Sequence, residues 1–275
     1  MPLAFSTLGC PGDSLEQVLE IARASGATGL ELRAADGEFI HPAMSAAERA
    51  AVAAELARAG VTVLTLASYV RVCAPGGEVD VELRAAIDLA ADLGASNVRV
   101  FPGAGIAPLD SGASMTEELA AADALGAQRL NAAAGHARAR GVELLLETHD
   151  SHPRASDIAR ILAGVAPDAP VKVIWDLMHP WRHDEAPERT AELLAGSLAY
   201  AQFKDGLRIP GTHDVTLTLP GDGELPLRRM RDLVTGVAAT RGDTDPWVSL
   251  EWERTWHPEL PPLADALAVL NAVLA

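Results

Sequence analysis

Residues 141–149 have the sequence Gly-Val-Glu-Leu-Leu-Leu-Glu-Thr-His, and they contain the unit that repeats through the chain. A glycine follows a segment of helical period, and a short apolar run follows the glycine. Gly26, Gly60 and Gly94 hold the same place before three other apolar runs. Because a left-handed glycine is favoured where a helix ends, these positions indicate that a β/α unit recurs along the chain.

Eight apolar runs follow this pattern, and they are nearly apolar on both faces, as parallel strands covered by helices are. They are Leu3–Gly9, Thr28–Arg33, Val61–Tyr69, Asn97–Phe101, Val142–His149, Val171–Asp176, Leu198–Lys204 and Trp247–Trp252. The segments of helical period include Ser14–Ala24, Ser45–Ala59, Val81–Leu93, Met115–Arg140, Ala155–Leu162 and Leu263–Leu274. Eight parallel strands with helical connections in about 250 residues predict an α/β fold, the (β/α)8 TIM barrel. An open doubly wound sheet is disfavoured, because no Gly-x-Gly-x-x-Gly follows the first run.

The composition restricts the organisation and the class of partner. No linker or low-complexity stretch divides the 275 residues, so we expect one domain over residues 1–275. With 22 basic and 38 acidic residues, the net charge of −16 argues against a nucleic acid or an anionic membrane as partner. Two cysteines without a C-x-x-C spacing, together with an amino terminus unlike a signal peptide, lead us to expect a cytoplasmic protein.

Polar side chains end four consecutive runs, where a barrel of this kind builds its site. They are Glu147, Asp176, Gln202 and Glu251. Three carboxylates directed into one barrel mouth would repel each other unless a cation neutralised them. Ligation by carboxylate and amide oxygens favours Mg²⁺ or Mn²⁺, with Co²⁺ or Zn²⁺ as less favoured alternatives. We therefore predict one divalent metal ion bound by these four residues.

Further polar residues close to these positions are candidates for chemistry. His149 and His179 each lie two or three residues beyond a proposed ligand, although a lone histidine after a strand is more often a surface residue. Lys204 comes two residues after Gln202 and so lies on the same face of the strand. There its positive charge would either stabilise an enolate or only offset the excess of carboxylates. Trp252 lies near the predicted mouth, where it would contact the carbon face of a sugar.

The four motifs at these strand ends resemble those of the xylose isomerase-like TIM-barrel superfamily. They are Leu-Glu-Thr-His at 146–149, Trp-Asp-Leu-Met-His at 175–179, Gln-Phe-Lys-Asp at 202–205 and Ser-Leu-Glu-Trp at 249–252. The resemblance covers nearly the whole chain. The superfamily includes sugar phosphate isomerases and epimerases, ketose 3-epimerases, hydroxypyruvate isomerases, inosose dehydratases and 3-dehydroshikimate dehydratases. It implies the same four metal ligands. It also implies that His179 and Arg208 bind substrate and that His149 completes a Glu-x-His pair.

Two positions depart from the superfamily's usual pattern. Most members have His-x-Lys-Asp where this chain has Gln202, and some dehydroshikimate dehydratases are similar to it in having glutamine there. Ketose 3-epimerases also have a second glutamate six residues after the first ligand, where this chain has Pro153. A ketose 3-epimerase of the usual type is therefore disfavoured.

The resemblance implies removal of a proton next to a carbonyl group. The leading hypothesis is a divalent-metal-dependent sugar or sugar phosphate isomerase or epimerase that acts through a metal-stabilised enediolate on a small hydroxy-carbonyl substrate. Glu147 and Glu251 would then be the base and the acid on opposite faces of the substrate. The alternative is a metal-dependent dehydratase like the 3-dehydroshikimate and inosose dehydratases, in which His149 or His179 supplies a proton to the leaving hydroxyl. A barrel that only binds a ligand is a third hypothesis, and the three carboxylates argue against it.

Two features leave questions of assembly open. Residues 206–226 are rich in glycine and proline, so we expect a long loop on the active face that serves as a lid or a partner surface. The alanine-rich stretches Ala120–Ala122 and Ala132–Ala134 permit close packing within one chain or between copies, which leaves a homo-oligomer open.

Overall fold

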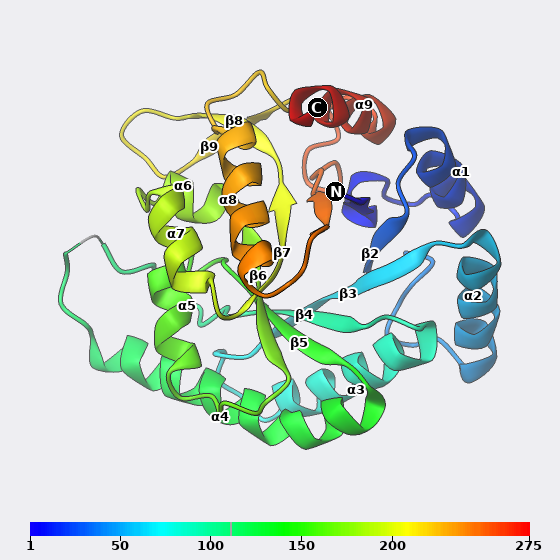
Figure 1. Ribbon diagram of the computed structural model, residues 1–275. Helices are drawn as coiled ribbons and strands as arrows, with labels where there is room; N and C mark the ends of the chain where they lie inside the picture. The colour runs from blue at the N-terminus through cyan, green and yellow to red at the C-terminus, as the bar shows by residue number, and fades with distance from the viewer. Residues whose placement is uncertain (111) are drawn as a thin grey trace.

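The computed structural model describes residues 1–110 and 112–275, and eight parallel strands in these residues form a closed barrel (Figure 1). The strands are β1 (Leu3–Ser6), β2 (Gly29–Arg33), β3 (Thr62–Arg71), β4 (Asn97–Phe101), β5 (Glu143–Glu147), β6 (Val171–Asp176), β7 (Leu198–Phe203) and β10 (Val248–Leu250). Their order around the barrel is the order of the chain, and β1 closes it by pairing with β10, Leu3 opposite Val248. The predicted TIM barrel is confirmed.

Helices surround the barrel on its outside (Figure 1). They are α1 (Leu15–Ser25), α2 (Ala46–Ala59), α3 (Glu78–Leu93), α4 (Glu117–Arg140), α5 (Ala155–Leu162), α6 (Met178–Arg182), α7 (Pro187–Leu194), α8 (Leu227–Thr240) and α9 (Leu263–Leu274). Ser14 and Ser45 cap α1 and α2 through complete capping boxes. The four glycines of the repeating unit end their helices in the left-handed conformation, as the sequence predicts. None of the helices in the described residues is both long and apolar enough to cross a membrane.

Several strands end earlier than the apolar runs that predict them. A 3-10 turn over Thr7–Gly9 replaces the end of the first run, and the side chain of Thr7 accepts the backbone N–H of Arg33 at 2.9 Å. His149 and Lys204 lie just beyond β5 and β7. The strands stop here because the chain must leave the barrel wall and turn towards the next helix.

Residues 206–226 are more ordered than the predicted long loop. The strands β8 (Asp205–Arg208) and β9 (Val215–Thr218) form an antiparallel hairpin in this segment. The buried carboxylate of Asp205 accepts the backbone N–H groups of Gly221, Gly223 and Leu225. This single side chain therefore fixes the return of the chain towards α8.

The barrel interior has an apolar layer and a polar layer. Leu145, Ile174 and Tyr200 belong to a small apolar cluster that is separate from the large core between strands and helices. Each of these residues comes two positions before Glu147, Asp176 or Gln202 on its strand. Because side chains alternate along a strand, the polar residues lie on the same inward face, one layer nearer the carboxyl ends of the strands. The fold thus places Glu147, Asp176 and Gln202 one layer above this small apolar cluster.

Candidate active site

The predicted metal ligands converge at the carboxyl end of the barrel. Glu147, Asp176 and Glu251 each offer a carboxylate oxygen, and these oxygens lie within 4.8 Å of one another. All three side chains are buried, as is that of Gln202, whose Nε2 donates a hydrogen bond of 3.2 Å to Glu251. β5, β6, β7 and β10, which carry these residues, are consecutive around the barrel, as the positions at the strand ends predict.

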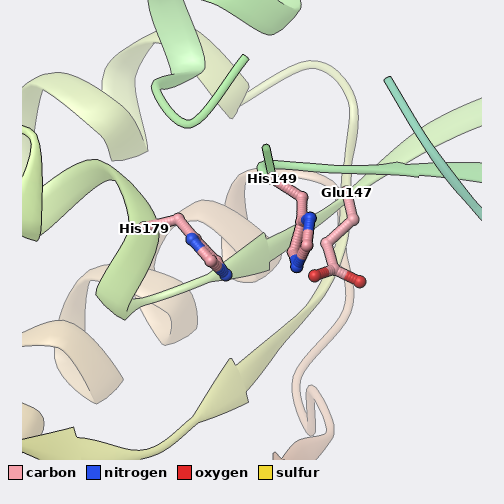
Figure 2. Close-up of side chains that lie close together, drawn as sticks. All are labelled: Glu147, His149 and His179. Carbon is pink, nitrogen blue, oxygen red and sulfur yellow. The ribbon is translucent and has the colours of Figure 1, made fainter. Parts of the chain in front are cut away.

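Two imidazoles complete a second group of ligand-capable side chains around Glu147. Glu147, His149 and His179 offer atoms within 4.8 Å of one another, and Figure 2 shows the three side chains pointing toward one another. The ring centroids of His149 and His179 are 4.5 Å apart. Glu147 therefore belongs to both groups of ligand-capable side chains.

Asp176, of the first group, also holds the start of α6 in place, because its Oδ1 accepts the backbone N–H groups of Met178 and His179.

Two buried cations contact the same carboxylates. The Nζ atom of Lys204 lies 2.7 Å from Asp176 Oδ2 and 2.7 Å from Glu251 Oε2, and it also pairs with Glu253. The Nη1 atom of Arg99 lies 3.2 Å from Glu251 Oε1 and 3.4 Å from Glu147 Oε2. These contacts lower the cost of burying several negative charges in one place.

The buried charges perturb one another. Burial raises the pKa of Glu147 well above its ordinary value, and the charges of Glu251 and Asp176 raise it further against the opposing effect of Arg99. Burial alone would lower the pKa of Lys204, but the neighbouring carboxylates, Asp176 first, outweigh burial and raise that pKa. Burial lowers the pKa of His179, which favours a neutral imidazole. Opposite shifts of this kind are typical of sites that move protons.

The unpaired atoms in the site fit a divalent metal ion. Within residues 1–110 and 112–275, neither carboxylate oxygen of Glu147 forms a hydrogen bond, and the same holds for Gln202 Oε1 and both ring nitrogens of His179. Buried polar atoms are rarely left without partners, so these atoms are available as ligands to a bound ion. The donors offered are mainly carboxylate and amide oxygens with imidazole beside them, a set that suits Mn²⁺ and also admits Zn²⁺ or Co²⁺.

A cavity of about 370 Å³ opens above these residues, which we call the main cavity. Its lining includes four of the predicted site residues, namely His149, His179, Lys204 and Glu251. Tyr69, Phe101 and Trp256 supply aromatic surface on its walls. The cavity therefore has a charged, ligand-bearing floor and aromatic sides, an arrangement suited to a small polar molecule with a carbon skeleton.

The structure places two predicted substrate-binding residues elsewhere. Trp252, for which a sugar contact is expected, is fully buried, donates a hydrogen bond from Nε1 to the Pro261 carbonyl, and does not line the main cavity. The reason is alternation: Glu251 faces inward, which turns the next side chain into the core. Arg208 is also absent from the lining of the main cavity. Its Nη1 atom lies 2.7 Å from Asp184 Oδ1, and its Cζ atom lies 4.1 Å from the centroid of the Trp181 ring.

Sequence reasoning missed Arg99, and Glu31 is a second buried charged residue close to the proposed ligands. Arg99 lies within the otherwise apolar run of β4, and Glu31 lies on β2 with its carboxylate accepting hydrogen bonds from Tyr200 and Gln202. Burial raises the pKa of Glu31, and the charge of Glu251 adds to this effect. A charged residue at an inward position of an apolar strand is the signal that identifies such residues in a sequence.

The chain belongs to the family of xylose isomerase-like TIM barrels, whose pattern residues 19–273 match. This result confirms the resemblance that the four strand-end motifs indicate. No curated protein matches the sequence.

Solved structures with the same fold cover almost the whole chain at low identity. A probable 3-DHS dehydratase, AsbF, from Bacillus anthracis is 15% identical, with a TM-score of 0.73 over 98% of this chain and 99% of its own. A D-psicose 3-epimerase studied with D-fructose is 14% identical, with a TM-score of 0.73 over 100% and 99%. An IOLI protein with a bound zinc atom is 18% identical, with a TM-score of 0.75 over 99% and 96%. These similarities concern the fold.

Proposed function

We propose that the protein is a divalent-metal-dependent isomerase or epimerase of a small hydroxy-carbonyl compound such as a sugar or a sugar phosphate. The observation that carries the proposal is the placement of Glu147 and Glu251. Glu147 ends β5 and Glu251 directly follows β10, and β6 and β7 separate these strands, yet both carboxylates approach the same Nη1 atom of Arg99. A substrate bound between them would have a carboxylate near each of its faces.

The metal would be held by Glu147, Asp176, Gln202 and Glu251. When bound, a divalent ion supplies Lewis acidity that polarises the substrate carbonyl. The proposed ligand set is supported by the order of these side chains, because their strands hold them and the backbone N–H groups of α6 hold Asp176. His149 and His179 are the neighbouring donors that would orient substrate hydroxyl groups.

The chain's own groups account for the movement of the proton. Glu147 would take a proton from the carbon next to the carbonyl, and Glu251 would return one from the opposite side. The positive charges of Lys204 and Arg99 would stabilise the developing enediolate oxygen. Return to the same carbon on the other face gives an epimer, and return to the adjacent carbon gives the aldose or ketose isomer.

A dehydratase is the second candidate, and the imidazole pair favours it. His149 and His179 lie beside Glu147, and one of them would supply a proton to a hydroxyl that leaves from the carbon next to the enolate. Gln202 in place of the usual histidine also supports a dehydratase. The similarity of fold to a probable 3-DHS dehydratase is consistent with this candidate, as the similarity to an epimerase is with the first.

Solvent exchange in D₂O distinguishes these candidates. The chain loaded with Mn²⁺ is incubated with ketoses, ketose phosphates and dehydroshikimate, and the products are analysed by NMR and mass spectrometry. Deuterium next to the carbonyl in an epimer or isomer supports the leading proposal, and loss of water with a new conjugated chromophore supports the dehydratase. Glu147→Gln should lose the activity, whereas Glu143→Gln, at the other end of β5, should keep it. Metal-loaded protein that neither exchanges nor converts any of these compounds would overturn the proposal.

A further inference from the structure

A second cavity of about 470 Å³ adjoins the main cavity, and we call it the side chamber. Arg71, Asp150 and Arg182 line both cavities, so the two spaces meet along these residues. Beyond them the side chamber is lined by residues of the loops after β4 and β5, by His183 after α6, and by His213 of the β8–β9 hairpin. Gly103 and Gly105 keep part of the wall free of side chains. A molecule held over the carboxylates can therefore extend into the side chamber.

Two arginines of the side chamber, the exposed Arg71 and the half-buried Arg182, have no acceptor among the described residues. In the part of the chain that the structure describes, neither Arg71 nor Arg182 donates a side-chain hydrogen bond or forms an ion pair, and the Nε atom of Arg182 is buried. The arginines of the neighbouring surfaces differ: Arg99 pairs with two glutamates, and Arg208 pairs with Asp184. A buried guanidinium N–H without an acceptor is unfavourable, so a ligand that accepts its hydrogen bond is favoured.

Two imidazoles add further donors. The rings of His183 and His213 stack with centroids 4.3 Å apart, and His213 Nδ1 lies 2.8 Å from the Arg182 carbonyl oxygen. His183 Nδ1 is buried and has no partner among the described residues. Burial lowers the pKa of His183 to about 3, and the nearby positive groups contribute to that shift. The ring is thus held neutral by its surroundings, and an anion placed beside it would oppose that effect.

Two acidic residues also line the side chamber. Asp150 is already engaged, since its Oδ1 lies 2.8 Å from His149 Nδ1. Asp214 is exposed to solvent before β9. Among the described residues, neither aspartate forms an ion pair with Arg71 or Arg182. The two guanidinium groups are therefore available to bind a ligand.

We propose that the side chamber binds an oxyanion, the carboxylate or phosphate end of the substrate, while the hydroxy-carbonyl end lies in the main cavity. Guanidinium groups recognise both oxyanions through paired hydrogen bonds. A volume of 470 Å³ is ample for such a group and a short carbon chain, since a water molecule takes about 30 Å³. The position of the reacting end rests on the proposed function, but binding of the anion does not.

The test is titration of the full chain with inorganic phosphate and, in a parallel arm, with malonate. Binding is followed by calorimetry and by the NMR signals of the histidine rings, with and without a metal chelator. We expect binding that does not depend on metal and that weakens about 10-fold in Arg71→Gln and in Arg182→Gln. His213→Asn should weaken binding less, and Arg58→Gln, exposed on α2, should bind as the wild type does. The tighter of the two anions identifies the source of the oxyanion.

Two results would overturn the proposal: no binding of either anion, or binding that both arginine variants leave unchanged. Circular dichroism of each variant confirms that the fold is retained. The outcome is independent of the proposed function, because Glu147→Gln should abolish solvent exchange and still bind the anion. Loss of anion binding in a chain that exchanges deuterium would refute only the side chamber.

Discussion

The Nζ atom of Lys204 lies 2.7 Å from Glu251 Oε2, and both side chains are buried at the carboxyl end of the barrel. The same ammonium group reaches Asp176, so one cation connects two of the proposed metal ligands. Of the chain's two lysines, this one is buried among carboxylates, and the other, Lys172, is half exposed at the opposite end of β6. Lys204 is therefore part of the site's charge balance.

Neutralising a ligating carboxylate should weaken metal binding. Glu147→Gln and Glu251→Gln each exchange a charged ligand oxygen for a neutral amide in the same shape. We expect the affinity for Mn²⁺ to fall about 10-fold or more in each variant, which is about 1.4 kcal/mol. Calorimetry with Mn²⁺ measures the change.

Glu143→Gln is the matched control for this measurement. Glu143 starts β5 and pairs with Lys172, four residues before Glu147 and away from the cluster. Its variant should bind Mn²⁺ as the wild type does. Equal affinity in all four proteins would show that the cluster does not hold the metal.

Removing the ammonium group of Lys204 should destabilise the barrel. Lys204→Met leaves Asp176 buried without its ammonium partner and Glu251 with Arg99 alone, and breaking a buried pair in this way costs about 3–5 kcal/mol. Added Mn²⁺ should recover part of that loss, because the ion supplies positive charge at the same carboxylates. Urea unfolding with and without Mn²⁺ measures both effects. Lys172→Met, which breaks a half-exposed pair, should cost under about 1 kcal/mol, and a similar cost for Lys204→Met would contradict the argument.

Asp123 connects α4 to the segment that follows the site histidine. Its carboxylate lies 2.7 Å from His152 Nε2 and 2.8 Å from Arg160 Nε. Asp123→Asn should reduce the free energy of unfolding at pH 7 by about 1–3 kcal/mol, because a buried charge-assisted hydrogen bond is lost. Asp88→Asn, which removes a half-exposed partner of Arg140, is the control and should cost less than about 1 kcal/mol.

The effect of Asp123 should depend on pH. Burial alone would raise the pKa of Asp123, but the hydrogen bonds from His152 and Arg160 outweigh it and lower that pKa below 3.8. The stabilisation is therefore present above pH 3.8 and is lost as the pH falls through the lower pKa of the folded state. Denaturation at a series of pH values should show the difference between wild type and Asp123→Asn shrinking in that range. A difference that stays constant down to pH 2 would exclude this origin.

His183 should make stability fall in mild acid. Its pKa is about 3 in the folded chain and 6.5 when unperturbed, so the unfolded state binds a proton that the folded state excludes. The free energy of unfolding should therefore decrease as the pH falls from 6.5, by up to about 1.4 kcal/mol per pH unit from this residue. His183→Gln should show a shallower decrease between pH 7 and pH 5. His257→Gln, at a half-exposed position, should follow the wild type, and identical slopes for all three proteins would refute the prediction.

Local pattern was sufficient for the fold and for the level of the site. Gly141 ends α4, and the apolar run after it forms β5, because a left-handed stop residue and a doubly buried strand both leave marks in the local sequence. Glu147, Asp176, Gln202 and Glu251 follow from the same logic, since the carboxyl ends of parallel strands meet at one end of the barrel. The hairpin β8–β9 was missed, because Asp205 fixes it through hydrogen bonds to residues about 16 to 20 positions away.

Only the tertiary structure decided which side chains contact one another across the barrel. Alternation along a strand fixes the face on which a side chain lies, but contact between Arg99 and Glu251 depends on the closure of the barrel and on the register of every strand between them. The same dependence buried Trp252 and left Trp256 to line the main cavity. The sequence by itself determined which strand-end polar residues, Glu147, Asp176, Gln202 and Glu251, lie at one end of the barrel. Strand register and closure then determined their partners, because those distances are set by pairings far apart in the chain.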